Sequence, residues 1–500
     1  MSERFVFNPP SPLASAGHSS LASVPLSAAP DAAEPEIPRR APQESRDWAF
    51  TWTLVFTAVL FLRPQDIFPP LGALHLAEVS ALAGLTSLFM ARLARRQPIT
   101  RMTPEFAGVL GFGAVLLMTA PFSIWPGGAI ETFQDMYAKV ILVYLLAVNV
   151  LMSPKRLERL TWLLVLTLGY FGFRAVFDYA RGVNLVARGT RVSGSVGGIL
   201  QNPNDLALNM VVFLPFAAFF AMEATSTIKR LIAAACAAGM LGAVVASGSR
   251  GGFLGLALML LVLTVLAARK RPGFVIVGVL VALCALPLVP ANYWRRIASI
   301  TDESKDDVES SQARRRLIGE SADAFMTYPL TGVGAGMFKN WNPPARQQTW
   351  QETHNVWLQV GAELGVFGLA AFLFLVVRAF YSVFQTRRLL RRFRPASSRI
   401  RTSRVRKPAP DPAGALSPRE SDLLNWHSAA MAASLAGFMV CALFASVAYN
   451  WTFYYLLALA AAPREILRDR LPARVPGRRT AATSSAAGVA AFAAAPRVRA

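Results

Sequence analysis

The most regular feature of the chain is a series of long apolar stretches separated by short polar segments. A hydrocarbon core about 30 Å thick requires roughly 20 apolar residues per helix, and twelve stretches come close to that length. They cover residues 48–62, 72–91, 106–121, 138–152, 160–178, 205–222, 231–247, 252–268, 273–290, 360–384, 428–446 and 450–463. The pattern predicts an all-α polytopic membrane protein with about twelve transmembrane helices.

Composition and charge support this prediction and distinguish the two sides of the membrane. The 500 residues are 54% hydrophobic and only 16% charged, which is too apolar for a soluble protein of mixed fold. If the amino terminus is cytosolic and each stretch crosses once, 35 of the 51 Lys and Arg residues lie in cytosolic segments and 14 in periplasmic ones. This bias follows the positive-inside rule and places both termini in the cytosol of a bacterial inner membrane. The net charge of +22 therefore favours contact with membrane lipids and argues against a nucleic-acid partner.

The polar segments define the domain organisation. One membrane domain covers residues 48–463, and it is flanked by a cytosolic tail over 1–46 and a basic tail over 470–500. Both tails are predicted to be disordered, because they contain few of the large apolar residues that a folded core requires. A basic cytosolic loop covers 386–424, and a large periplasmic loop over 291–354 joins the ninth and tenth spans.

The large periplasmic loop contains a predicted helix and a glycine-rich segment. Apolar residues at helical spacing predict a helix from Ser311 to Thr327 that lies on the membrane surface. Arg314 stands near its beginning, and the segment Pro329–Gly336 begins fifteen residues later. Such glycines could let backbone N–H groups approach a phosphate, or they could form a simple turn beside a solvated row of arginines. The residues alone leave both interpretations open.

A second candidate is Arg250, which lies in a tight turn between two apolar stretches. The turn reads Ser247-Gly248-Ser249-Arg250-Gly251-Gly252, so Arg250 must lie at or just under the periplasmic surface. A guanidinium group is costly there unless an anion or a water-filled cavity meets it, which indicates a functional residue. The alternative is an arginine that extends its charged end to the lipid headgroups.

A third candidate is His354, one of only four histidines in the chain. It stands where the large periplasmic loop enters the tenth span, and Asn355 follows it directly. After nine intervening residues the chain reads Gly365-Val366-Phe367-Gly368. A single histidine is structural more often than catalytic, so its position rather than its type makes it a candidate.

Together these features resemble the O-antigen ligase and polymerase family of bacterial membrane glycan transferases. Arg250 matches the family's arginine at a tight periplasmic turn, and Arg314 matches the arginine that opens a helix in its late periplasmic loop. His354 begins a His-Asn-x9-Gly-x-x-Gly motif that fits at every specified position. Asn202–Asp205 and Arg63–Asp66 extend the resemblance, which covers roughly residues 50–460 and implies a GT-C-like membrane fold.

The resemblance implies an enzyme that transfers a glycan from a polyprenyl (undecaprenyl) diphosphate carrier at the periplasmic face. An O-antigen ligase acting on lipid A-core is the first expectation, and a polysaccharide polymerase or a protein O-oligosaccharyltransferase would share the motifs. Guanidinium groups suit a departing diphosphate because they stay ionised and bind phosphate oxygens in pairs. We therefore expect catalysis by Arg250, Arg314 and His354 with no metal and no cofactor. His354 could accept the acceptor's proton or bind the diphosphate.

Four further residues are weaker candidates for donor binding, namely Asn355, Arg188, Arg191 and Asn204. Arg174 and Asp178 are spaced four residues apart on a helix and are expected to form a structural ion pair. The main rivals from another functional class are a twelve-helix transporter and a lipid-glycan flippase. A transporter would show related halves and ionisable residues near the middle of the bilayer, whereas the candidates here gather on one side.

Overall fold

The computed structural model describes residues 47–187, 189–268, 294, 310–342, 350–393 and 416–471. Nearly all of this described part is helical, and nine of its helical segments are long and apolar enough to cross a membrane. They are Pro69–Ala94, Pro104–Phe122, Pro126–Val150, Pro154–Arg181, Pro203–Glu223, Thr227–Ala246, Arg250–Ala267, Val356–Arg392 and Pro418–Phe444. Each coincides with one of the predicted spans, so the protein is a polytopic membrane protein.

The other three predicted spans have different outcomes. Helix α1 (Trp48–Leu62) forms where expected, but its 15 residues extend only about 22 Å, less than the thickness of the hydrocarbon core. Helix α16 (Trp451–Asp469) also forms, but its last turns carry charged residues such as Arg464 and Glu465. The predicted span 273–290 lies outside the described residues.

Most helices begin at a polar residue whose side chain accepts a hydrogen bond from the first turn. Thr103, Ser153, Asn202 and Ser417 act in this way, and each is followed by a proline that fits the first helical position.

The remaining elements are α2 (Pro64–Ile67), α3 (Leu76–Ala94), α4 (Pro104–Thr119), α5 (Pro126–Thr132), α6 (Ala138–Val150), α7 (Pro154–Arg181), α8 (Pro203–Glu223), α9 (Thr227–Ala246), α10 (Arg250–Ala268), α13 (Ser310–Thr327), α14 (Val356–Arg392) and α15 (Pro418–Cys441). Two short strands, β1 (Leu185–Val186) and β2 (Arg191–Val192), form an antiparallel pair.

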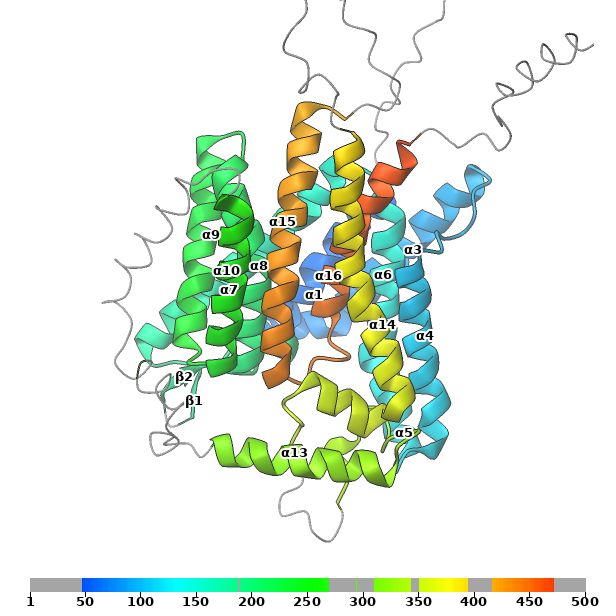
Figure 1. The fold of residues 1–500 in the computed structure, drawn as a ribbon, viewed down its shortest axis with the longest axis vertical. Helices are drawn as coiled ribbons and strands as arrows, with labels where there is room; N and C mark the ends of the chain where they lie inside the picture. Colours follow the sequence, from blue (N-terminus) through cyan, green and yellow to red (C-terminus); the bar gives the residue numbers. More distant parts are fainter. Residues whose placement is uncertain are drawn as a thin grey trace, which may run out of the picture. The chain divides into compact units, whose positions relative to one another are not determined.

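Helix α8 lies at the centre of a group of packed helices, and it contacts α7, α9, α10 and α15 (Figure 1). Small residues let neighbouring helices approach closely. A Cβ atom added to Gly172 of α7 would lie only 2.6 Å from the carbonyl carbon of Gly239 in α9. Close backbone approach of this kind is how helices associate in lipid, where the hydrophobic effect contributes little between them.

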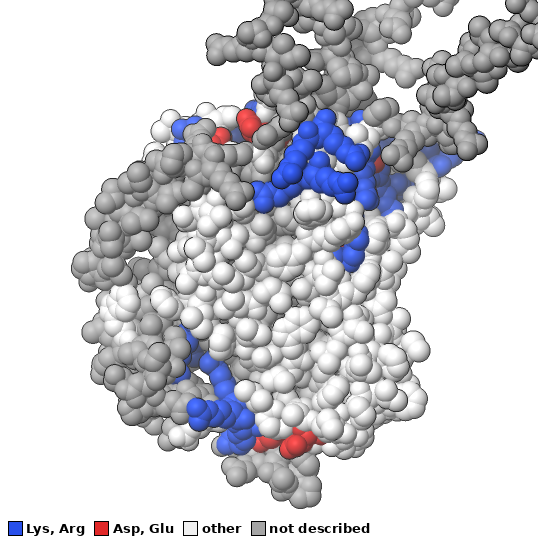
Figure 2. Space-filling view, in the orientation of Figure 1, with Lys and Arg blue, Asp and Glu red and all other residues white. Residues whose placement is uncertain are grey.

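Charged side chains gather at two ends of the membrane domain, and a broad uncharged surface separates them (Figure 2). One charged cluster is buried among α4, α14 and α16. Glu105, in the first turn of α4, accepts hydrogen bonds from Arg378, Arg464 and Ser382 at 2.6–2.9 Å. The Glu105 and Arg464 side chains are fully buried. Because each buried charge has a partner, the cluster ties α4, α14 and α16 together.

Helix α13 runs across one end of the helices rather than parallel to them (Figure 1). It covers Ser310–Thr327, which confirms the helix predicted in the large loop. It packs against the beginning of α14, and Leu317 and Ala324 of α13 are buried in a small apolar cluster with Ala362 of α14. This end of the molecule contains the candidate site.

Candidate functional site

The turn before α10 places Arg250 at the first residue of that helix. Gly248 adopts a left-handed conformation with φ of 55°, which reverses the chain within three residues. Ser249 then accepts a hydrogen bond from Gly252 N at 3.1 Å and so satisfies one N–H group of the first turn. The Arg250 residue is only 6% exposed. The guanidinium group is thus enclosed by protein at the end of a membrane helix.

A hydrogen-bond network from another loop holds this turn in place. Arg191 donates from Nε to the carbonyl oxygen of Ser247 at 2.9 Å and from Nη2 to Asn204 Oδ1 at 2.7 Å. Asn204 Oδ1 also accepts from Ser249 Oγ at 2.9 Å. Two of the weaker sequence candidates, Arg191 and Asn204, are therefore in direct contact with the Arg250 turn.

Phe444 connects the Arg250 turn to α13. It packs so tightly on Gly251 that a Cβ atom there would lie 2.6 Å from Phe444 Cβ. Arg314 Cζ lies 5.2 Å from the centroid of the Phe444 ring, which is a cation–π distance. Phe444 therefore contacts both Gly251, the residue next to Arg250, and Arg314 of α13.

His354 lies beside the same segment. Its backbone N–H donates to Ser446 Oγ at 3.0 Å, and its φ of 48° is a left-handed conformation that is strained for a residue with a side chain. Burial, followed by the positive charges of Arg314 and Arg191, holds the pKa of His354 below its usual value. The imidazole is therefore neutral at neutral pH, and it lies within the electrostatic field of two of the candidate arginines.

The structure gives the remaining candidates different places. Asn355 Oδ1 accepts hydrogen bonds from Trp357 N and Leu358 N, so its side chain caps α14. Arg188 lies outside the described residues. The predicted ion pair is confirmed, with Arg174 Nε 2.9 Å from Asp178 Oδ1.

The glycine-rich loop forms a turn that supports α14. Helix α14 is interrupted at Gly365, which has φ of 63° and ψ of −157°. This interruption leaves carbonyl groups of the preceding turn without helical partners, and Val333 N and Gly334 N donate to Ala362 O and Glu363 O at 2.9 Å. The loop's N–H groups at these positions are therefore used within the protein. The Gly-x-x-Gly part of the His354 motif is needed because the chain must break the helix here.

Comparison with protein families identifies the segment that contains these features. Residues 235–373 match the family model described as O-antigen ligase. This segment is a domain of the O-antigen ligase family. It includes Arg250, Arg314 and His354, whereas Arg191 and Asn204 precede it. Proteins of this family are enzymes that transfer lipid-linked glycans. No curated protein matches the chain.

Three residues near the O-antigen ligase domain's histidine were not identified from the sequence. Phe444 and Ser446 follow the domain in the loop between α15 and α16, and that loop carries no charged residue that would signal a site. Glu352 stands two residues before His354. Its pKa is raised by the protein packed around it, although the charge of Lys339 opposes that rise. The position of Glu352 two residues before His354 was visible in the sequence. The hydrogen bond between the His354 backbone and Ser446 Oγ was not.

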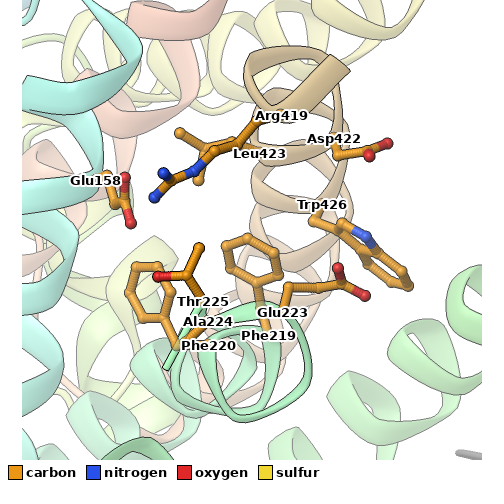
Figure 3. A pocket seen from close by; sticks show the side chains of 10 residues that line it. All are labelled: Glu158, Phe219, Phe220, Glu223, Ala224, Thr225, Arg419, Asp422, Leu423 and Trp426. Carbon is orange, nitrogen blue, oxygen red and sulfur yellow. The ribbon is translucent and has the colours of Figure 1, made fainter. Parts of the chain in front are cut away.

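The O-antigen ligase domain's candidate residues do not line the cavity drawn in Figure 3. That cavity, of about 320 Å³, is formed where the start of α7, the end of α8 and the start of α15 meet. Figure 3 shows Arg419 pointing across it toward Glu158, with Phe219 and Phe220 on its wall. Among the described residues, no group of three or more His, Cys, Asp and Glu side chains is arranged to hold a metal ion.

Proposed function

We propose that this protein transfers a glycan from an undecaprenyl diphosphate carrier to an acceptor at the periplasmic face of the bacterial inner membrane, as an O-antigen ligase. The observation that carries the proposal is that the Arg250 turn, Arg314 and His354 all contact the segment Phe444–Ser446. In this proposal the protein crosses the membrane about twelve times in a GT-C-like fold and keeps both termini in the cytosol.

The proposed chemistry follows from the charges of these side chains. Displacing a diphosphate from the anomeric carbon moves negative charge onto the leaving oxygen. Arg250 and Arg314 would stabilise that charge, because a guanidinium group donates two parallel hydrogen bonds to phosphate oxygens. We propose that these two cations supply the positive charge without a metal ion. Arg191, which holds the Arg250 turn, would add to the same field.

The test is transfer of glycan from an undecaprenyl diphosphate donor to lipid A-core by the purified protein in nanodiscs with EDTA. Arg250→Lys should lose nearly as much activity as Arg250→Ala, because an ammonium group supplies charge but not the planar pair of donors. Arg391→Ala, an exposed arginine near the far end of α14, is the matched control and should retain wild-type activity. Full activity in Arg250→Lys, or a strict need for added divalent metal, would show that the proposed chemistry is wrong.

A polysaccharide polymerase and a protein O-oligosaccharyltransferase would use the same donor chemistry. A deletion strain distinguishes a ligase from a polymerase. Loss of a ligase leaves bare lipid A-core together with long polyprenyl-linked chains, whereas loss of a polymerase leaves core capped with a single repeat. The transporter and flippase alternatives receive less support, because the Arg250 turn, Arg314 and His354 meet at one end of the helices, around Phe444–Ser446.

A further inference from the structure

The cavity drawn in Figure 3 lies at the end of the helices opposite the candidate site. Helix α8 begins beside Asn204 of the Arg250 network and ends at Glu223 on the cavity wall, and its 21 residues extend about 32 Å. Helices α7 and α15 both begin near the cavity, at Pro154 and Pro418. Because all three helices are long and apolar enough to span a membrane, the cavity lies at the level where the hydrocarbon core meets the lipid headgroups.

Buried aromatic side chains form one wall of the cavity. Phe219 and Phe220, near the end of α8, and Trp426 of α15 all line it. The rings of Phe219 and Trp426 are stacked with their centroids 6.3 Å apart, and Phe220 is stacked on Trp162 of α7 at 4.2 Å. The wall is therefore fixed by packing between three helices. The volume of about 320 Å³ falls within the range of about 300–1,000 Å³ that is usual for binding sites of small molecules.

Two side chains of opposite charge face each other across the cavity without forming an ion pair. Figure 3 shows Arg419, from the first turn of α15, directed toward Glu158, which lies near the beginning of α7. Neither side chain has a hydrogen bond or an ion pair with any residue of the described part of the chain. Arg419 is exposed and Glu158 is partly exposed, so a ligand can reach both from outside. The space between them is bounded by a hydrogen-bond donor on one side and an acceptor on the other.

The charges of the lining argue against a simple anion or a simple cation as the occupant. Glu158, Glu223 and Asp422 contribute three carboxylates, and Arg419 is the single basic side chain among the described residues that line the cavity. A phosphate alone would be repelled by the carboxylates, and an ammonium ion alone would be repelled by Arg419. A ligand that carries both charges a short distance apart avoids both penalties. Its phosphate binds the guanidinium group, and its ammonium group donates to the Glu158 carboxylate.

We propose that this cavity binds the headgroup of phosphatidylethanolamine, a zwitterionic phospholipid. The phosphate contacts Arg419 and the ammonium group donates hydrogen bonds to Glu158, while the two methylene groups between them lie against Phe220, which Figure 3 shows on the same side of the cavity. The level of the cavity in the bilayer favours a lipid over a free metabolite, because headgroups are always concentrated there. This binding does not depend on the proposed glycan transfer, so failure of either leaves the other standing.

The test titrates single lipids into the full-length protein in detergent and measures the first binding event by native mass spectrometry. Phosphatidylethanolamine and phosphatidylglycerol share the phosphate and differ in the ammonium group. The wild-type protein should bind the first lipid at least about tenfold more tightly than the second, the low end expected for a hydrogen bond between charged groups. Glu158→Gln should reduce this preference to less than about twofold. Arg419→Gln should weaken the binding of both lipids and keep the preference between them.

Two matched controls and a third lipid make the test specific. Glu131→Gln, an exposed carboxylate of α5, and Arg391→Gln, an exposed arginine near the end of α14, should both bind as the wild-type protein does. Phosphatidylcholine keeps the positive charge but has no N–H group to donate to Glu158. It should therefore bind the wild-type protein at least about threefold more weakly than phosphatidylethanolamine, and this comparison needs no variant to fold.

Several results would overturn the proposal. These are equal affinity of the wild-type protein for phosphatidylethanolamine and phosphatidylglycerol, a full preference that survives Glu158→Gln, or binding that Arg419→Gln leaves unchanged. Phosphatidylcholine that binds as tightly as phosphatidylethanolamine would also overturn it, because Glu158 would then not recognise the N–H groups. Soluble phosphoethanolamine that binds as tightly as the lipid would identify the occupant as a free metabolite and would contradict the assignment to a lipid.

Discussion

Replacing Asn204 with Ala tests whether the network behind the Arg250 turn is needed for activity. The side chain accepts two hydrogen bonds through one oxygen atom, from Arg191 Nη2 at 2.7 Å and from Ser249 Oγ at 2.9 Å. A hydrogen bond to a charged group contributes about 1.5–3 kcal/mol, and a neutral one contributes about 0.5–1.5 kcal/mol. Their joint loss therefore corresponds to about 2–4 kcal/mol.

The expected effect on catalysis follows from that range. Each 1.4 kcal/mol of lost transition-state stabilisation reduces the rate about tenfold. If the loosened turn no longer holds Arg250 in place, kcat/KM for glycan transfer should fall by about 30-fold to about 1,000-fold. Asn204→Asp keeps both acceptor contacts and should recover at least about tenfold over Asn204→Ala. Asn425→Ala, in the first half of α15 and away from this network, is the control.

The assay measures initial transfer rates in nanodiscs together with the melting temperature of each variant. Asn204→Ala should stay folded, because its contacts lie at the end of a helix rather than in the core of the bundle. Wild-type kcat/KM in Asn204→Ala would refute the reasoning. So would an Asn204→Asp protein that is as inactive as the alanine variant, because the contacts would then not be what matters.

Three further predictions concern the histidine and the buried charged cluster. His354→Ala should reduce transfer at least about 100-fold with little change in melting temperature, and full activity would contradict a role in the reaction. Histidine-labelled NMR, feasible because the chain has four histidines, should give His354 a pKa below 6.5 that rises in Arg314→Gln; a pKa unaffected by this change would show that the two side chains do not interact. Glu105→Ala should lower the free energy of unfolding by about 3–5 kcal/mol, because Arg464 is left buried without its carboxylate; a variant as stable as wild type would contradict this.

The sequence by itself determined where most of the described helices form and which residue types could carry the chemistry. Apolar stretches and capping residues such as Asn202 act over one helix at a time, so their pattern can be interpreted locally. The same holds for Arg250, whose position in a short turn between two spans already placed it at the end of a helix. His354 was found because its motif includes Gly365, and the structure shows that this glycine breaks α14.

Only the tertiary structure decided which residues meet. Ser446 contacts the backbone of His354 across 92 residues of sequence, and no periodicity encodes such a contact. Phe444 contacts both Gly251 and Arg314 because the beginnings of α10 and α13 and the end of α15 meet at the same place. The role of the glycine-rich loop was also open until its N–H groups were seen to bind the carbonyls freed at the break in α14. Hydrophobic pattern specifies burial along one element, whereas a site depends on packing between elements, and packing is fixed only when all of them are in place.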